Sequence, residues 1–151
     1  MPQLTMSNIP SKPAQAGFTM LEVLVAMVIL SIGLLGLAGL QATGLQANHS
    51  AYLRSQAAFL AYDILDIMRA NREGARGGDY DIALNASLSA STQPELVYWG
   101  ANVAASLPQG DAAVATAAVG LGGRQVTVTI QWDDSRAGGA TAQQLTITTQ
   151  L

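Results

Sequence analysis

The 151-residue sequence predicts an α+β fold, in which a long N-terminal helix packs on a small C-terminal antiparallel sheet. Helical periodicity without a proline extends from Phe18 to Arg72, and apolar and polar residues alternate in two short segments near the C-terminus. Aromatic residues make up only 5% of the chain, so alanine and aliphatic side chains must fill most of the core. A chain of this length allows one small globular domain beside the apolar part of the helix.

Residues 1–17 are polar and rich in proline, serine and glutamine. Proline opposes a regular helix because it lacks the backbone N–H and fixes φ. Three prolines fall in this segment, namely Pro2, Pro10 and Pro13. We therefore expect residues 1–17 to be a leader that precedes the long helix.

The next segment, Phe18 to Leu40, contains one charged residue, Glu22. A helix of this length reaches roughly 34 Å, which spans the hydrocarbon core of a bilayer. We expect residues 18–41 to form the membrane-spanning first half of the long helix. A secretory signal peptide cleaved near Ala42-Thr43-Gly44 is the alternative, but the apolar segment is longer than such peptides usually have and Lys12 is the leader's single positive charge.

The second half of the helix is amphipathic, with apolar residues at intervals of three or four. This stripe consists of Leu45, His49, Leu53, Ala57, Leu60, Ile64 and Ile67. We expect it to pack against the rest of the chain. The glycine-rich segment from Asn71 to Asp81 is expected to end the helix and to open a connecting loop.

A short helix is predicted around Trp99, Val103 and Leu107, which recur every four residues before Pro108 and Gly110. A strand from Leu96 to Trp99 is the alternative. The residues before this segment, 83–93, have no clear period and are expected to be irregular.

Two strands are predicted from alternation in "QVTVTIQW" and "QLTITTQL", and the loop between them suggests an antiparallel hairpin. The preceding "AAVATAAV" predicts a third strand less strongly, because alanine favours helix. A turn at Gly120 to Gly123 supports a meander of three strands.

The inventory of chemically reactive side chains is small. The sequence has no cysteine, which excludes thiol catalysis, iron–sulfur clusters and cysteine-based zinc sites, and His49 is its single histidine. His49 lies on the apolar stripe, so we expect it to be packed or at an interface. Asp133 and Asp134 could pair or bind a cation, but their place between a strand and a glycine-rich loop favours a solvated turn. Tyr98 and Trp99 are expected to be core residues.

No catalytic residue, cofactor site or metal site is therefore expected, and the chain is not predicted to be an enzyme. Asp79 and Asp81 lie in a glycine-rich loop, and "VGLGGR" lacks the strand and helix that flank a dinucleotide-binding fingerprint. The formal net charge is −3 and the basic residues are scattered. Binding to nucleic acid is not expected from such a distribution.

Glu22 is the unusual residue of the apolar segment. A charge at the bilayer centre costs about 3 kcal/mol on insertion scales and less near the interface. Glu22 could simply extend to the membrane surface. The alternative is a cation at the same depth, and cleavage just before Phe18 would create one, because a free amine has a pKa of about 8.

The stretch "GFTMLEVLVAMVILSIGLLGL" closely resembles the class III signal of type IV prepilins and type II secretion pseudopilins. The resemblance rests on Gly17, Phe18 at the first mature position and Glu22 at the fifth, followed by a long apolar helix. It implies that a prepilin peptidase cuts between Gly17 and Phe18 and methylates the new amine of Phe18. It also implies that Glu22 neutralises the amine of a neighbouring subunit as the helix leaves the bilayer for a filament.

Further resemblance to minor pilins extends through the segment from Gly33 to Arg72 and includes "LPQG" and "VTVTIQWDD". The apolar helix has no proline and the chain has no cysteine for a disulfide loop, whereas major pilins commonly have both features. The resemblance thus implies a pilin-like fold with residues 42–151 as a periplasmic domain. It implies an inner-membrane subunit that later joins a type IV pilus, with other minor pilins, the major pilin and the inner-membrane assembly platform as partners.

Two alternatives remain at this point. A minor pseudopilin of a type II secretion system has the same signal and fold. A signal-anchored periplasmic binding or enzymatic domain would require a cleft lined by converging polar groups. Glycines in the first half of the helix are compatible with an ordinary membrane helix or with close helix approach; they are Gly33, Gly36, Gly39 and Gly44.

Overall fold

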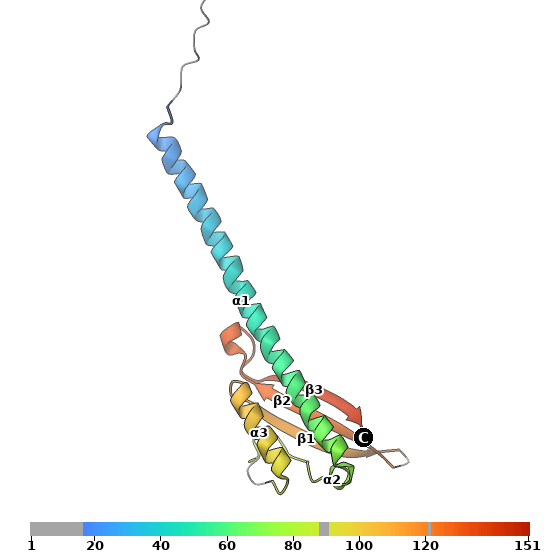
Figure 1. The fold of residues 1–151 in the computed structure, drawn as a ribbon. Coiled ribbons are helices and arrows are strands. Elements are labelled where there is room, and N and C mark those ends of the chain that lie inside the picture. Colours follow the sequence, from blue (N-terminus) through green and yellow to red (C-terminus); the bar gives the residue numbers. More distant parts are fainter. Residues whose placement is uncertain (1–16, 88–90, 121) are drawn as a thin grey trace, which may run out of the picture. The chain divides into compact units, whose positions relative to one another are not determined.

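A computed structural model describes residues 17–87, 91–120 and 122–151 (Figure 1). The elements in chain order are α1 (Met20–Ala70), α2 (Arg72–Gly77), α3 (Pro94–Ser106), β1 (Asp111–Val119), β2 (Gly123–Trp132), the 3₁₀ helix η2 (Ser135–Ala137) and β3 (Gln143–Gln150). This confirms the predicted α+β fold with a long N-terminal helix. The leader predicted at residues 1–17 lies outside the described residues except for Gly17. The chain divides into two compact units, which meet between Leu40 and Gln41.

The described part of the first unit is dominated by the apolar start of α1. Every described residue up to Leu40 is exposed, including Phe18 at 84%. α1 is long and apolar enough to cross a membrane, judged by length and composition, and its most apolar window is not buried within the protein. A helix that is apolar on all sides needs an apolar environment outside its own chain.

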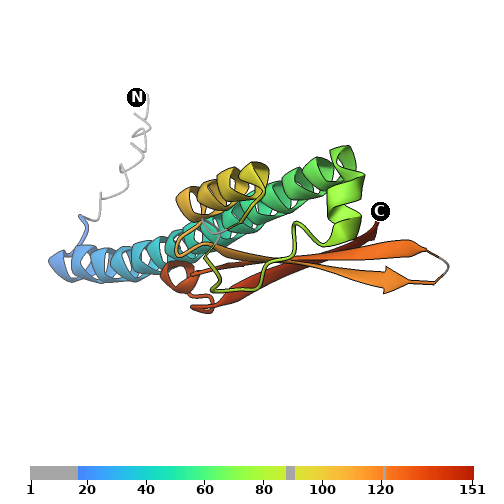
Figure 2. The ribbon, with the colours of Figure 1, turned by 90° about the horizontal axis from the view of Figure 1, so that it is seen from below.

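The second unit contains a three-stranded antiparallel meander in the order β1-β2-β3. Val114 on β1 pairs with Val128 on β2, and Val128 pairs with Ile147 on β3. All three predicted strands are thus confirmed, including the alanine-rich β1. Figure 2 shows α3 and the C-terminal part of α1 on the same side of this sheet.

The core of the second unit lies between these helices and the sheet. Its largest fully buried side chains are Trp99, Trp132, Tyr80, Ile64, Leu65, Met68, Leu96 and Ile130. The outer face of the sheet is polar, and Thr127 and Thr129 lie within 3.4 Å of Thr148 and Thr146 across the strands. The predicted alternation of buried and outward residues on β2 is confirmed.

The buried stripe of α1 differs from the predicted one. Leu45 and His49 are exposed and Leu60 and Ile67 are only partly buried. The stripe instead consists of Leu53, Ala57, Ala61, Ile64, Leu65 and Met68. The physical reason is that the buried face of α1 is centred on Ala57 and Ala61. Their small side chains allow close packing but contribute little to the apolar pattern of the sequence.

The prediction that a loop begins at Asn71 is wrong. α1 ends at Ala70, but Asn71 then acts as the N-cap of α2, and its Oδ1 accepts a hydrogen bond from the Gly74 N–H at 3.2 Å. The backbone leaves the helical conformation briefly at Asn71, which has φ of −115° and ψ of 68°, and leaves it again after α2 at Gly78, which has φ of 86°. A capping asparagine starts a new helical turn after the old one ends, so glycines placed C-terminal to it do not open a loop at once.

The segment around Trp99 forms the predicted helix and not the alternative strand. Pro94 occupies the first turn of α3, where a missing N–H costs nothing. Trp99, Val103 and Leu107 are buried as expected. Tyr98, however, is 71% exposed, so its assignment to the core is wrong; α3 covers the core with one face and Tyr98 lies on the other.

Candidate functional site

The predicted processing segment lies at the start of α1. Gly17, Phe18 and Thr19 are outside the helix and exposed, and a Cβ added at Gly17 would have no atom of the described residues within 4 Å. The hydroxyl and carbonyl oxygens of Thr19 accept hydrogen bonds from the Glu22 N–H at 3.3 and 3.1 Å. Thr19 therefore caps the helix just after the Gly17–Phe18 bond, and both residues of this bond are exposed outside the helix.

Glu22 is exposed in the first turn of α1. Its carboxylate has no ion-pair partner among residues 17–87, 91–120 and 122–151. The positive end of the helix dipole favours an acidic residue in this turn but does not neutralise it. The geometry thus leaves a carboxylate four residues from Phe18 that is available to a group from outside the described chain.

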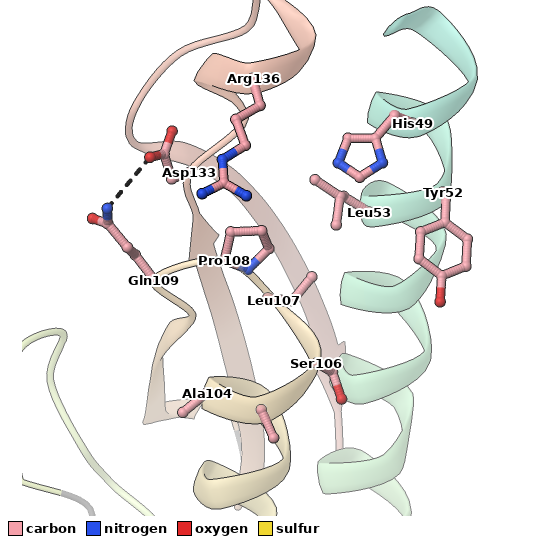
Figure 3. A pocket seen from close by; sticks show the side chains of 11 residues that line it. His49, Tyr52, Leu53, Ala104, Ser106, Leu107, Pro108, Gln109, Asp133 and Arg136 are labelled. Carbon is pink, nitrogen blue, oxygen red and sulfur yellow. Dashed lines mark hydrogen bonds between the residues drawn. The ribbon is translucent and has the colours of Figure 1, made fainter. Parts of the chain in front are cut away.

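A second group of polar side chains surrounds a cavity of about 560 Å³ in the second unit (Figure 3). Its walls come from α1, the end of α3 and the loop that carries η2. The lining residues are His49, Tyr52, Leu53, Ala104, Ala105, Ser106, Leu107, Pro108, Gln109, Asp133 and Arg136. His49 is therefore exposed at a cavity, and it is not packed into the core as one of its two predicted roles required.

Asp133 is held at the edge of this cavity. Its Oδ1 accepts a hydrogen bond from the Ser135 N–H at 2.8 Å, and its Oδ2 lies 3.4 Å from Nε2 of Gln109. Hydrogen bonds from the side chain and backbone of Ser135, aided by the charge of Arg136, hold the pKa of Asp133 below its ordinary value of 3.8. Asp133 is thus a fixed anion in the predicted turn.

Asp134 contradicts the prediction of a solvated turn, because it is only 3% exposed. Its Oδ2 accepts a hydrogen bond from Ser50 Oγ at 2.6 Å, which connects the η2 loop to α1. A side chain at Gly139 would meet Cγ of Asp134 at 2.9 Å, so this position needs glycine. The partner Ser50 lies 84 positions away, and no local sequence signal could have found it.

The other acidic pair, Asp79 and Asp81, has a structural role. Asp81 accepts hydrogen bonds from the N–H and the hydroxyl of Thr116 at 2.9 and 3.0 Å, and Asp79 accepts one from Gln93 at 3.2 Å. Within the described ranges no group of three or more histidine, cysteine or acidic residues could hold a metal ion.

Comparison with known proteins identifies the N-terminal segment. The Prokaryotic N-terminal methylation motif matches residues 12–38, a range that includes Gly17, Phe18 and Glu22. No curated protein and no solved structure matches the chain. The chain therefore carries a prokaryotic N-terminal methylation motif, which covers the start of α1, on an α+β fold.

Proposed function

We propose that the chain is a minor pilin of the type IV pilus, similar to the type IV pilus modification protein PilV, which primes or supports pilus assembly. The observation that carries the proposal is the exposed Gly17–Phe18 bond, followed in the first turn of an exposed apolar helix by Glu22, which has no ion-pair partner among the described residues. Its partners would be a prepilin peptidase, other minor pilins, the major pilin and the inner-membrane assembly platform.

Cleavage between Gly17 and Phe18 creates the cation that Glu22 lacks. The new amine of Phe18, which the peptidase also methylates, is protonated at neutral pH because such amines have a pKa of about 8. A carboxylate and an ammonium that pair in a low-dielectric bundle offset a desolvation cost that either alone would carry. We place the pair between neighbouring subunits, so that each Glu22 recognises the Phe18 of another subunit.

Before assembly, residues 18–41 would hold the protein in the inner membrane and residues 42–151 would lie in the periplasm. The absence of a proline in the apolar helix and of any cysteine favours a minor subunit over the bulk filament protein. A minor pseudopilin of a type II secretion system shares the signal and the fold, and the experiments below separate the two roles.

The most direct test is the N-terminus of the mature protein. Mass spectrometry of the chain isolated from membranes is expected to give an N-terminal N-methylated Phe18. An N-terminus near Gly44 would instead identify a cleaved secretory signal peptide and would refute the proposal.

Replacement of Glu22 by alanine is expected to leave cleavage largely intact but to prevent incorporation into pili. The matched control is Glu95→Ala, which removes an exposed carboxylate from the first turn of α3. Immunoblots of sheared pili and of membranes measure incorporation and cleavage separately. Normal piliation and normal incorporation of the Glu22→Ala protein would overturn the assigned role.

Replacement of Gly17 by leucine is expected to block processing. The fold itself should tolerate the change, because a Cβ at this position has no atom of residues 17–87, 91–120 or 122–151 within 4 Å. Gly33→Leu, at another glycine with open space around it, is the control and should be cleaved normally. Detection of a mature N-terminus at Phe18 in the Gly17→Leu protein would show that the cleavage site is wrong.

Deletion of the gene separates the two assembly roles. Loss of surface pili with normal protein secretion supports the minor pilin, whereas normal piliation with a secretion defect supports the pseudopilin.

A further inference from the structure

The cavity beside His49 has a polar rim with two charged side chains, Asp133 and Arg136, which both come from the segment after β2. His49 projects into it from α1, and Arg136 extends from the η2 loop so that its guanidinium lies between Asp133 and His49 in the view of Figure 3. His49 and Arg136 are both exposed. Neither makes an ion pair or a side-chain hydrogen bond with another residue that the structure describes. The N–H donors of both side chains are thus available to a bound group, although the charge of Arg136 also acts on Asp133 in the same lining.

The acidic group of the cavity is already engaged. Asp133 uses Oδ1 for Ser135 and Oδ2 for Gln109, so its carboxylate is held on the loop side, away from His49. The other titratable group from α1 is Tyr52, whose hydroxyl oxygen accepts a hydrogen bond from Gln56 at 3.0 Å. The end of α3 contributes the hydroxyl of Ser106 and no charged side chain to the lining. An anion that enters the cavity would therefore meet more free donors than acceptors.

The wall of the cavity next to these donors is apolar. Leu53 and Leu107 are buried core residues that reach this wall, and Pro108 and Ala104 complete it. A ligand that fits must combine a hydrogen-bond-accepting anion with a short apolar group. A guanidinium can bind the two oxygens of a carboxylate through parallel N–H groups, which gives the pair strength and geometric selectivity.

We propose that this cavity binds a carboxylate carried on a short apolar group, with Arg136 and His49 as the donors and Leu53, Leu107 and Pro108 as the apolar contact. The carboxylate could come from a free small organic acid or from an acidic side chain of a neighbouring subunit. Both sources offer the same chemistry. The site itself does not depend on the proposed pilin function.

The experiment uses the single histidine as a reporter. The full mature chain, labelled at histidine and held in detergent micelles, is titrated with isovalerate while the NMR signal of the His49 ring is followed. A saturable shift with a dissociation constant on the order of 1 mM is expected for so small a ligand. Isovaleramide has the same shape without the charge and is expected to cause no saturable shift.

Variants test the donors. Arg136→Gln is expected to weaken isovalerate binding about tenfold or more, because a charge-assisted hydrogen bond is lost. Arg136→Lys should restore part of it, and Arg54→Gln, which removes an exposed arginine of α1 outside the cavity lining, should leave it unchanged. Raising the salt concentration should weaken binding.

Two results would overturn the proposal: no saturable shift with isovalerate, or an equal shift with isovaleramide. Both are measured on the unmodified chain, so misfolding of a variant cannot hide them. N-acetylglutamate amide, which presents a side-chain carboxylate in a peptide context, distinguishes the sources. Tighter binding than isovalerate would favour a subunit side chain as the source, and weaker binding would favour a free acid.

Discussion

Trp99 connects two helices through a single side chain. It is fully buried on α3, and its Nε1 donates a hydrogen bond to the carbonyl oxygen of Leu60 on α1 at 2.8 Å. A buried indole whose N–H has a partner contributes both apolar area and a fixed orientation. The angle at which α3 packs on α1 thus depends on this residue, whereas its neighbour Tyr98 is exposed to solvent.

The change Trp99→Phe should lower the free energy of unfolding by about 1–3 kcal/mol, because it removes the hydrogen bond and leaves a space beside α1. The control Tyr98→Phe should change it by less than about 0.5 kcal/mol. Urea unfolding of the full chain in micelles, followed by the fluorescence of buried Trp132, measures both. Equal stabilities of the two variants would show that the contact with Leu60 contributes nothing.

Asp133 allows a prediction about pH. Its folded-state pKa lies below 3.8, so the contribution of its ionised form to stability is complete above that value and is lost as the pH falls through the folded-state pKa. Since the largest cause is the side-chain hydrogen bond from Ser135, Ser135→Ala should raise the pKa of Asp133 toward 3.8. Carboxyl-carbon NMR titration of both proteins measures the change. An unchanged titration of Asp133 would assign the lowered pKa to another group.

Candidate site residues could be predicted from the sequence where neighbouring residues form a recognisable motif. Gly17, Phe18 and Glu22 occur within six consecutive residues, and the methylation motif that matches residues 12–38 includes all three. Their roles in cleavage and assembly stay a prediction. The burial of Asp134 was not predictable, because it depends on Ser50, which is brought close only by the fold.

The helices and strands differ in how well the pattern of apolar residues predicts them. The strands were predicted correctly because the side chains of a strand alternate between its two faces. In β2 every second residue from Val126 to Trp132 is buried. The burial of α1 was predicted less well, because Ala57 and Ala61 line its buried face while the larger Leu60 lies at the margin. The pattern of apolar residues identifies a helix more reliably than it identifies the orientation of that helix.

The segment of α1 between its apolar start and its packed end should be the least stable part of the helix. Residues 42–49 are all exposed and include Gly44, which costs roughly 1 kcal/mol of helix propensity relative to alanine. Hydrogen exchange of the full chain in micelles should therefore be faster here than at residues 57–68. Gly44→Ala should slow this exchange about fivefold.

The control for that change is Gly36→Ala, within the apolar run, which should leave exchange at residues 42–49 unaltered. Protection of residues 42–49 equal to that of the packed segment would contradict the prediction. It would mean that the exposed turns gain stability from contacts other than burial within the second unit.

On the scale of the whole molecule, the proposed cleavage would alter the charge as well as the N-terminus. The full chain has seven basic and ten acidic residues, and removal of the leader with Lys12 leaves six arginines, so the mature side chains sum to −4. Exposed arginines near the end of α1, such as Arg69 and Arg72, are interspersed with Asp66 and Glu73. A surface of this kind does not present the continuous basic patch that a phosphate backbone requires.

The mature chain should therefore show no measurable affinity for duplex DNA at physiological ionic strength. The matched control is a variant in which Asp63, Asp66 and Glu73, all exposed, are replaced by lysine, which leaves nine basic against seven acidic side chains, or +2. This variant should gain weak binding that falls steeply with salt, because neutralised phosphates release counterions. Fluorescence anisotropy of labelled DNA measures both proteins. Salt-dependent binding by the unmodified mature chain would show that its arginines act together despite the acidic residues between them, and would reopen a role in DNA capture.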